Sequence, residues 1–128
     1  MRLLVDTQAL LWWLRDERRL SSRARRAIAQ VEHVRFFSVA AAWELTIKCS
    51  TGKLKLAVPV GRLLAEHLPV NHTEILGVTL NDLVRLESLP WHHRDPFDRL
   101  MAAQALERGL HIVSSDAVFE TYGIDRIW

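Results

Sequence analysis

The chain has 128 residues, of which 49% are hydrophobic and 25% charged, which is ordinary for a globular protein and unlike disordered or collagen-like chains. The net charge of +2 is compatible with a polyanionic partner but does not require one. Cys49 is the only cysteine, so an internal disulfide is excluded and a reducing compartment fits. We expect one domain over residues 1–128, cytoplasmic and with no membrane segment, because no apolar run reaches about 18 residues.

The first half of the chain predicts two strands, each followed directly by a helix. The apolar run "LLV" (residues 3–5) favours a buried strand that ends at Asp6, and residues 7–14 favour a helix. Residues 20–32 predict a second helix, which Ser21 or Ser22 can cap. Its expected apolar face consists of Ala24, Ala27, Ile28 and Val31. The segment "VRFFSV" (34–39) predicts the second strand, and Ser38 offers a cap for a helix ending near Gly52.

The second half continues the same alternation. We expect a short extended piece over residues 53–58, a helix from Pro59 to about residue 68, and a weak strand over 73–78. Thr79 is the expected cap of the next helix, which stops at Pro90. Residues 94–109 show a complete helix pattern, with Asp95 as cap, Pro96 in the first turn and Gly109 past the end. A strand over 111–116, a short helix over 117–123 and a strand over 124–128 close the chain.

This repeated strand–helix order predicts an α/β fold with a parallel sheet and helices on both faces. Ligands of such sheets bind beyond the carboxyl ends of the strands. Asp6 follows the first strand and Asp116 follows a late strand, so both are expected at that edge. Asp98 shares a helical stripe with Ala102 and Ala105, whose small side chains allow the helix to approach the sheet closely.

Glu44 is the fourth acid that we expect at this edge. It lies within the apolar segment "AAAWEL", beside a helical face formed by Ala40, Trp43 and Ile47. An acid in that position has little structural purpose, whereas the other three have simple alternatives. Asp6 and Asp116 can cap helices, and Asp98 lies in a first helical turn, where an acid favours the helix dipole.

Four carboxylates in one crevice repel one another and raise one another's pKa values unless a cation lies between them. Carboxylate oxygens suit a hard ion such as Mg²⁺ or Mn²⁺ rather than zinc. Such an ion lowers the pKa of a bound water and neutralises charge on a phosphate, which is the chemistry of phosphodiester hydrolysis.

Four segments together resemble the PIN domain, and within it the VapC-type toxins of toxin–antitoxin pairs. They are "LLVDTQALLWWL", "FSVAAAWELTIK", "HHRDPFDRLMAAQAL" and "HIVSSDAVFETYG", and they follow the family's order over nearly the whole chain. The resemblance implies a Rossmann-like fold and an endoribonuclease that depends on Mg²⁺ or Mn²⁺. It also implies that the catalytic, metal-binding acids are Asp6, Glu44, Asp98 and Asp116.

Several neighbouring residues are assigned secondary roles by the same resemblance. Ser114 stands where the family usually has the threonine of T-x-D, and its hydroxyl can orient a carboxylate or water. We favour Asp98 as the metal ligand and Asp95 as the helix cap. Arg99 is expected either to contact a phosphate of RNA or to be a solvated surface residue.

Other residues near the expected site keep two interpretations each. His92 and His93 can bind phosphate or pack in the loop, and loop packing is favoured. Lys48 can pair with Glu44 or with RNA. The tryptophans 12, 13 and 43 are expected in the core or in an interface rather than as stacking platforms for bases.

The resemblance further implies a homodimer and a small VapB-type antitoxin whose C-terminal segment crosses the active-site groove. The apolar helical segments Leu10–Leu14 and Leu63–Leu68 are expected parts of that groove. The basic segment from Arg15 to Ala27 is either a solvated helix face or a contact surface for phosphates or an acidic partner segment.

Two phosphotransfer functions lack the residues they need, and two other functions remain open. A haloacid-type phosphatase needs a second aspartate two residues after Asp6, where the chain has Gln8. A response-regulator receiver needs an acidic pair near the first strand and an aspartate on a middle strand, and neither is found. A non-catalytic PIN-like binding module and a DNA or flap nuclease both stay compatible with the acids.

Overall fold

The sheet has five parallel strands, which confirms the α/β prediction. The computed structural model describes residues 1–128. Its strands are β1 (Arg2–Val5), β2 (Val34–Ser38), β3 (Thr73–Leu76), β4 (His111–Val113) and β5 (Arg126–Ile127). They lie in the order β3-β2-β1-β4-β5, so the chain reverses its direction across the sheet between β1 and β4. In parallel sheets, ligands bind in the crevice at such a reversal.

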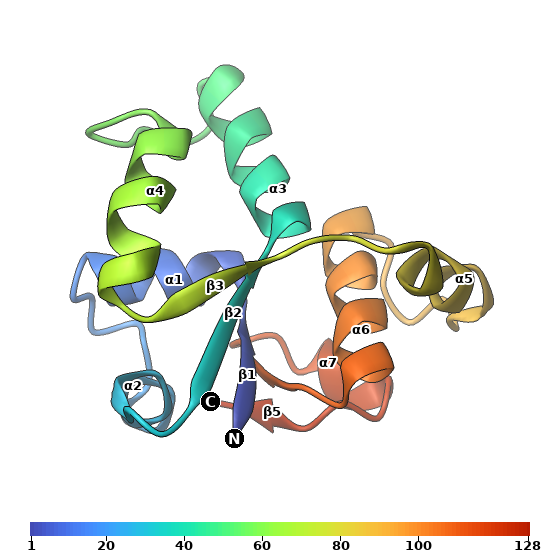
Figure 1. Cartoon of the computed structure of the whole chain (residues 1–128). Coiled ribbons are helices and arrows are strands. Elements are labelled where there is room, and N and C mark those ends of the chain that lie inside the picture. Colours follow the sequence, from blue (N-terminus) through green and yellow to red (C-terminus); the bar gives the residue numbers. More distant parts are fainter.

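Seven helices connect the strands. They are α1 (Thr7–Leu14), α2 (Ser22–Ala29), α3 (Val39–Ser50), α4 (Val60–Val70), α5 (Leu80–Ser88), α6 (Pro96–Arg108) and α7 (Val118–Thr121). Figure 1 shows α1, α2 and α4 on one side of the sheet and α5, α6 and α7 on the other. Right-handed crossovers produce this division, because the connection from β3 to β4 runs in the opposite direction to the first two. None of the helices combines the length and apolar character needed to span a membrane.

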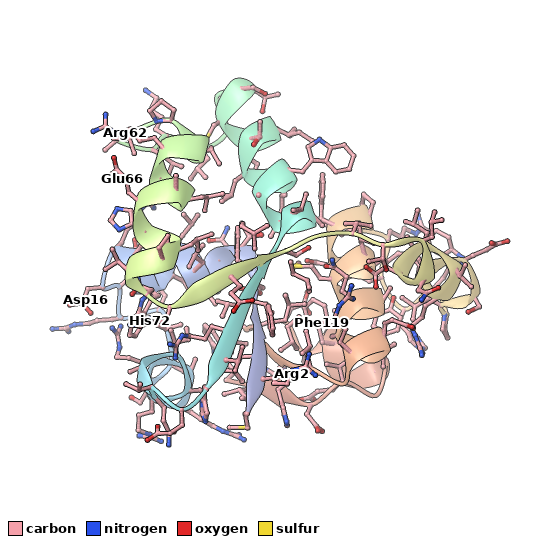
Figure 2. The ribbon with its side chains drawn as sticks, in the orientation of Figure 1. Arg2, Asp16, Arg62, Glu66, His72 and Phe119 are labelled. Atoms are coloured by element: carbon pink, nitrogen blue, oxygen red, sulfur yellow. The ribbon has the colours of Figure 1, made fainter.

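The core lies on both faces of the central strand, β1. Leu3, Leu4 and Val5 of β1 are completely or almost completely buried, as a strand covered on both sides requires. Ala102 and Ala105 of α6 are also buried, so this helix packs closely on its neighbours, as the alanine stripe predicts. Phe119 of α7 joins the core, whereas Arg62 and Glu66 form an ion pair on the outer side of α4 (Figure 2).

The predicted caps are confirmed. Ser21, Ser38 and Thr79 each accept a hydrogen bond from a backbone N–H in the first turn of the helix that follows. Asp95 caps α6 in the same way, and Gly109 ends it with a φ of 63°, which favours glycine. Local side-chain chemistry therefore defines where these helices begin, and for α6 also where it ends.

In two places the local structure differs from what the sequence pattern suggests. The second helix ends at Ala29, because Gln30 adopts an extended conformation, and Val31 is 80% exposed instead of lying on the apolar face. Residues 53–58 contain no strand, although they alternate in polarity. Leu54 and Leu56 still pack against the core from this loop, which accounts for the alternating pattern without strand pairing.

Candidate active site

A polar cleft of about 250 Å³ lies at the carboxyl ends of β1 and β4. It brings together all four acids expected there, and Asp95 beside them. No hydrophobic residue lines it; the lining residues are Asp6, Thr7, Gln8, Glu44, Lys48, Asp95, Asp98, Ser115 and Asp116. Elements distant in sequence thus converge at the point where the strand order reverses, as the parallel topology predicts.

Asp6 combines two roles at the end of β1. Its Oδ1 accepts a hydrogen bond of 2.7 Å from the N–H of Ala9 and so caps α1. The nearby Ser114 hydroxyl favours the ionised form of this carboxylate and so lowers its pKa. The backbone N–H of Asp6 donates to the carbonyl of Val113 at 3.1 Å, which ties the end of β1 to β4. Capping and a position at the rim of the cleft are therefore compatible.

Glu44 points inward from α3, and the expected apolar face of that helix is wrong. Trp43 is 59% exposed, whereas Glu44 is 8% exposed and belongs to the inward side together with Leu45. Glu44 Oε1 accepts a hydrogen bond of 2.7 Å from the Thr7 hydroxyl, and its Oε2 lies 3.3 Å from Lys48 Nζ. Pairing with Glu44 was one of the two expected roles of Lys48, and the structure confirms it.

The two aspartates at the start of α6 have different partners. Asp95 Oδ1 accepts hydrogen bonds from the backbone N–H groups of Phe97 and Asp98, at 2.9 and 3.2 Å. Asp95 is thus the helix cap. The side chain of Asp98 takes no part in capping and faces the cleft, where its Oδ2 lies 3.1 Å from His93 Nε2.

Ser114 organises the end of β4. Its side chain is completely buried, its Oγ accepts a hydrogen bond of 3.1 Å from the N–H of Asp116, and its hydroxyl also lowers the pKa of Asp6. Asp116 Oδ1 in turn accepts from the N–H of Val118 at 3.0 Å, just before α7. Serine at this position therefore connects the acids that follow β1 and β4.

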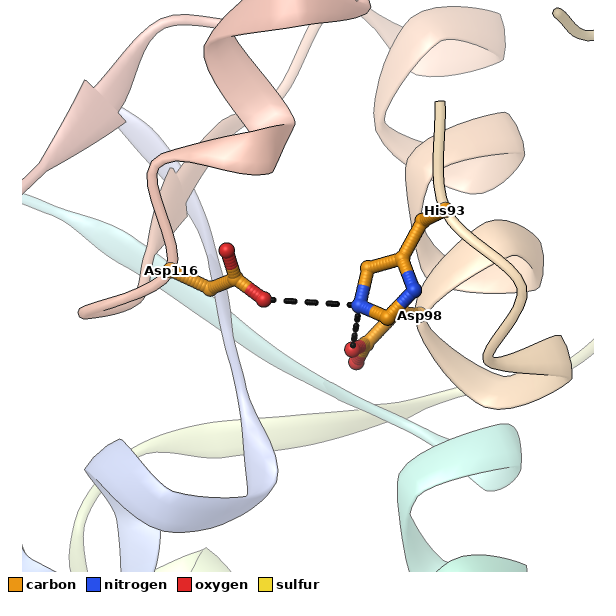
Figure 3. Close-up of side chains that lie close together, drawn as sticks. All are labelled: His93, Asp98 and Asp116. Carbon is orange, nitrogen blue, oxygen red and sulfur yellow. Dashed lines mark ion pairs between the residues drawn. The ribbon is translucent and has the colours of Figure 1, made fainter. Parts of the chain in front are cut away.

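His93 lies in the site, although loop packing was the favoured interpretation for both histidines. Its Nε2 is 3.1 Å from Asp98 Oδ2 and 3.4 Å from Asp116 Oδ2 (Figure 3). His92 does pack in the loop, with its ring centroid 5.0 Å from that of Tyr122. The position of His93 two residues before the Asp95 cap was the available signal, because it places the ring beside the first turn of α6.

Both expectations for Arg99 are wrong. This side chain is only 4% exposed, and its guanidinium lies over the Trp91 ring, 3.7 Å from the centroid. It donates hydrogen bonds to the carbonyls of Leu89 and Pro90, at 3.2 and 2.8 Å. Arg99 therefore holds the end of α5 against α6 and is neither solvated nor free to contact a phosphate.

Burial and mutual repulsion disturb the ionisation of two of the acids. Burial raises the pKa of Asp98 to about 7, and the charges of Asp95 and Glu44 add to the effect. Burial likewise raises the pKa of Asp6 to about 6, despite the hydrogen bonds that this carboxylate accepts from Ser114 and Ala9. A cation between the carboxylates relieves both effects. The oxygen-rich donor set fits a hard divalent ion.

The two apolar segments expected in the antitoxin groove differ in their surroundings. Leu10 and Leu11 of α1 are buried in the core and present no groove. Leu64 and Leu68 of α4 are mostly buried as well, but they line a shallow cavity together with Ile75 of β3.

In the basic segment Arg15–Ala27, three arginines pair with nearby acids; they are Arg15, Arg19 and Arg25.

A parallel α/β sheet with an acid-lined cleft at its reversal point is the arrangement expected of a PIN-type domain. The PIN domain family model matches residues 3–124, and the chain belongs to this family. It is 34% identical to ribonuclease VapC22 of Mycobacterium tuberculosis over an alignment of 116 residues. This alignment covers 88% of this chain and 85% of that protein.

Solved structures share the fold at low sequence identity. VapBC2 from Rickettsia felis, bound to a DNA fragment from its promoter, superposes with a TM-score of 0.73 at 14% identity and covers 100% of both chains. A toxin–antitoxin complex from Klebsiella pneumoniae superposes with a TM-score of 0.58 at 16% identity and covers 89% of this chain and 86% of that one. These likenesses establish the PIN architecture.

Proposed function

We propose that this protein is a metal-dependent endoribonuclease, the toxin of a toxin–antitoxin pair, inhibited by a cognate antitoxin. The observation that carries the proposal is the convergence of Asp6, Glu44, Asp98 and Asp116 on one polar cleft at the reversal point of the sheet. The 34% identity to a protein named as a ribonuclease supports RNA as the substrate.

The four acids are the proposed ligands of Mg²⁺ or Mn²⁺. Such an ion supplies Lewis acidity, both to the attacking water and to the phosphate. Thr7 orients Glu44 through its hydroxyl, and Ser114 orients Asp6 in the same way. Lys48 adds positive charge at the edge of the cleft, where it can attract the RNA backbone.

Cleavage of a mixed RNA pool by the purified protein tests this function. The reactions contain Mg²⁺, Mn²⁺ or EDTA, and the Asp6→Asn variant is compared with the wild type. Asp125→Asn is the matched control, since Asp125 is 85% exposed and lies outside the cleft. Cutting that requires both the metal and Asp6 supports the nuclease. Intact RNA with folded, antitoxin-free protein contradicts it and favours a binding module, and equal cutting of DNA favours a broader nuclease.

We also propose that the protein forms a homodimer through α3. Val39, Trp43 and Ile47 follow one another at four-residue spacing and are all exposed, so they form an apolar stripe on this helix. Light scattering is expected to show a dimer for the wild type and a monomer for Trp43→Arg. An unchanged dimer in this variant contradicts the assignment of the interface.

The antitoxin is proposed to run from the shallow cavity between α4 and β3 toward the acidic cleft. The presence of a toxin–antitoxin complex among the structural neighbours supports a partner of this kind. A cytoplasmic location agrees with an RNA substrate and with the lone thiol of Cys49. Copurification with the product of an adjacent small reading frame, and loss of RNA cleavage in that complex, tests the partnership.

A further inference from the structure

The backbone and the imidazole of His93 are each held by a hydrogen bond. The backbone N–H of His93 donates to the Tyr122 hydroxyl at 3.0 Å, which attaches the loop to the end of α7. The ring Nδ1 accepts a hydrogen bond of 3.1 Å from the backbone N–H of Asp95, the residue that caps α6. The ring therefore has a defined orientation at the mouth of the cleft.

This orientation determines which ring nitrogen carries the proton. A nitrogen that accepts a hydrogen bond has no proton of its own, so Nδ1 is the unprotonated atom. The neutral ring then carries its proton on Nε2, which is the atom that faces the two carboxylates. Figure 3 shows this nitrogen between Asp98, from α6, and Asp116, which follows β4.

We propose that His93 is a positioning residue whose Nε2–H bridges Asp98 and Asp116 and holds them at the spacing that the divalent cation needs. The inference rests on the proposed function, in which these acids bind the cation. Each carboxylate has its Oδ2 near Nε2, and the Oδ1 of Asp116 also accepts the hydrogen bond from the N–H of Val118. The bridge matters most for Asp116, whose side chain is 46% exposed and is otherwise held only by the hydrogen bond that its Oδ1 accepts from the N–H of Val118.

The same geometry argues against His93 as a direct metal ligand. Ligation through Nε2 requires a free electron pair on that atom, so the proton has to move to Nδ1. A proton on Nδ1 then points at the N–H of Asp95 and breaks the hydrogen bond that orients the ring. Hydrogen bonds from an outer residue to ligating carboxylates commonly change metal affinity by about 10–100-fold.

Calorimetric titration of the metal-free full-length protein with Mn²⁺ tests the inference without measuring activity. His93→Ala is expected to bind Mn²⁺ about tenfold more weakly than wild type, because the two carboxylates lose their shared donor. His93→Gln places an amide N–H near the position of Nε2 and is expected to restore affinity to within about threefold of wild type. His92→Ala is the matched control and leaves affinity unchanged, since His92 packs on Tyr122. Circular dichroism verifies that each variant is folded.

A spectroscopic measurement distinguishes the positioning role from ligation. Long-range ¹H–¹⁵N spectra of the wild type are expected to show the His93 proton on Nε2, both without metal and with saturating Mg²⁺. Transfer of the proton to Nδ1 on adding Mg²⁺ identifies a ligand and overturns the proposal.

The calorimetric outcomes are equally decisive. Unchanged or tighter Mn²⁺ binding by His93→Ala refutes the bridge, and so does a His93→Gln variant as weak as His93→Ala. Absence of Mn²⁺ binding by the wild type overturns the inference together with the metal site. If the Mn²⁺ affinities of the wild type and the variants follow the expected order but the wild type cleaves no RNA, only the proposed function is overturned.

Discussion

Replacing Asp98 by asparagine is expected to stabilise the metal-free protein above neutral pH, although it removes a proposed ligand. Burial, with the charges of Asp95 and Glu44, raises the pKa of Asp98 from 3.8 to about 7. A carboxyl group whose pKa rises on folding destabilises the folded protein increasingly as the pH climbs from the unfolded to the folded pKa. The difference is about 3 pKa units, which corresponds to at most roughly 4 kcal/mol at pH 8. Because asparagine keeps the side-chain shape and leaves an oxygen beside His93 Nε2, we expect a gain of about 2–4 kcal/mol.

Thermal unfolding in EDTA at pH 8 and pH 5 measures this gain. For a chain of this length, the expected increase in Tm at pH 8 is about 7–15 °C. At pH 5 the gain should fall to less than about half, because Asp98 is then already neutral in the folded protein. Saturating Mg²⁺ should remove the advantage, since the cation stabilises the wild type. Asp125→Asn, an exposed control, should change Tm little. An equal gain at both pH values, or none at pH 8, refutes the charge argument.

Three further predictions concern stability and the division of roles in α6. Arg99→Ala is expected to destabilise the protein by about 3 kcal/mol in urea unfolding, because it leaves buried carbonyls without donors; a loss below about 1 kcal/mol contradicts this role. Asp95→Asn should retain RNA cleavage, because asparagine still caps a helix, whereas Asp98→Asn should abolish it; equal losses argue against our assignment. Burial opposes the ionisation of Asp82, but Arg108 outweighs it and lowers the pKa of this carboxyl. Asp82→Asn should therefore destabilise the protein by about 3 kcal/mol at neutral pH. This effect should disappear as the pH falls from 3.8, the pKa in the unfolded chain, through the lower pKa of the folded protein. A destabilisation that persists in acid identifies another cause.

Local signals in the sequence predicted most of the secondary structure. Ser21, Ser38, Thr79 and Asp95 mark the starts of their helices because each satisfies backbone N–H groups within its own first turn. Such interactions depend on only a few consecutive residues. The extent of the second helix was overestimated at Val31 because a hydrophobic residue in helical register does not by itself continue a helix.

The acids of the candidate site were also predicted, for a topological reason. Parallel strands end at one edge of a sheet, so Asp6 and Asp116 could be placed together without knowledge of any contact. Glu44 was correctly expected at the cleft, but the apolar helix face expected beside it was wrong, because Trp43 turns outward. Periodicity identifies an apolar side chain without showing whether a core or a partner covers it.

The amino-acid sequence was enough to predict the alternation of strands and helices, the caps, and the sheet edge at which the acids gather. These features follow from local hydrogen bonding and strand direction. The roles of His93 and Arg99, in contrast, depend on how distant segments pack together. Their partners include Asp116, Leu86 and Leu89, which belong to other elements of the fold. A long polar side chain can reach several neighbours, and its choice depends on the packing of whole helices and loops, which no local pattern encodes.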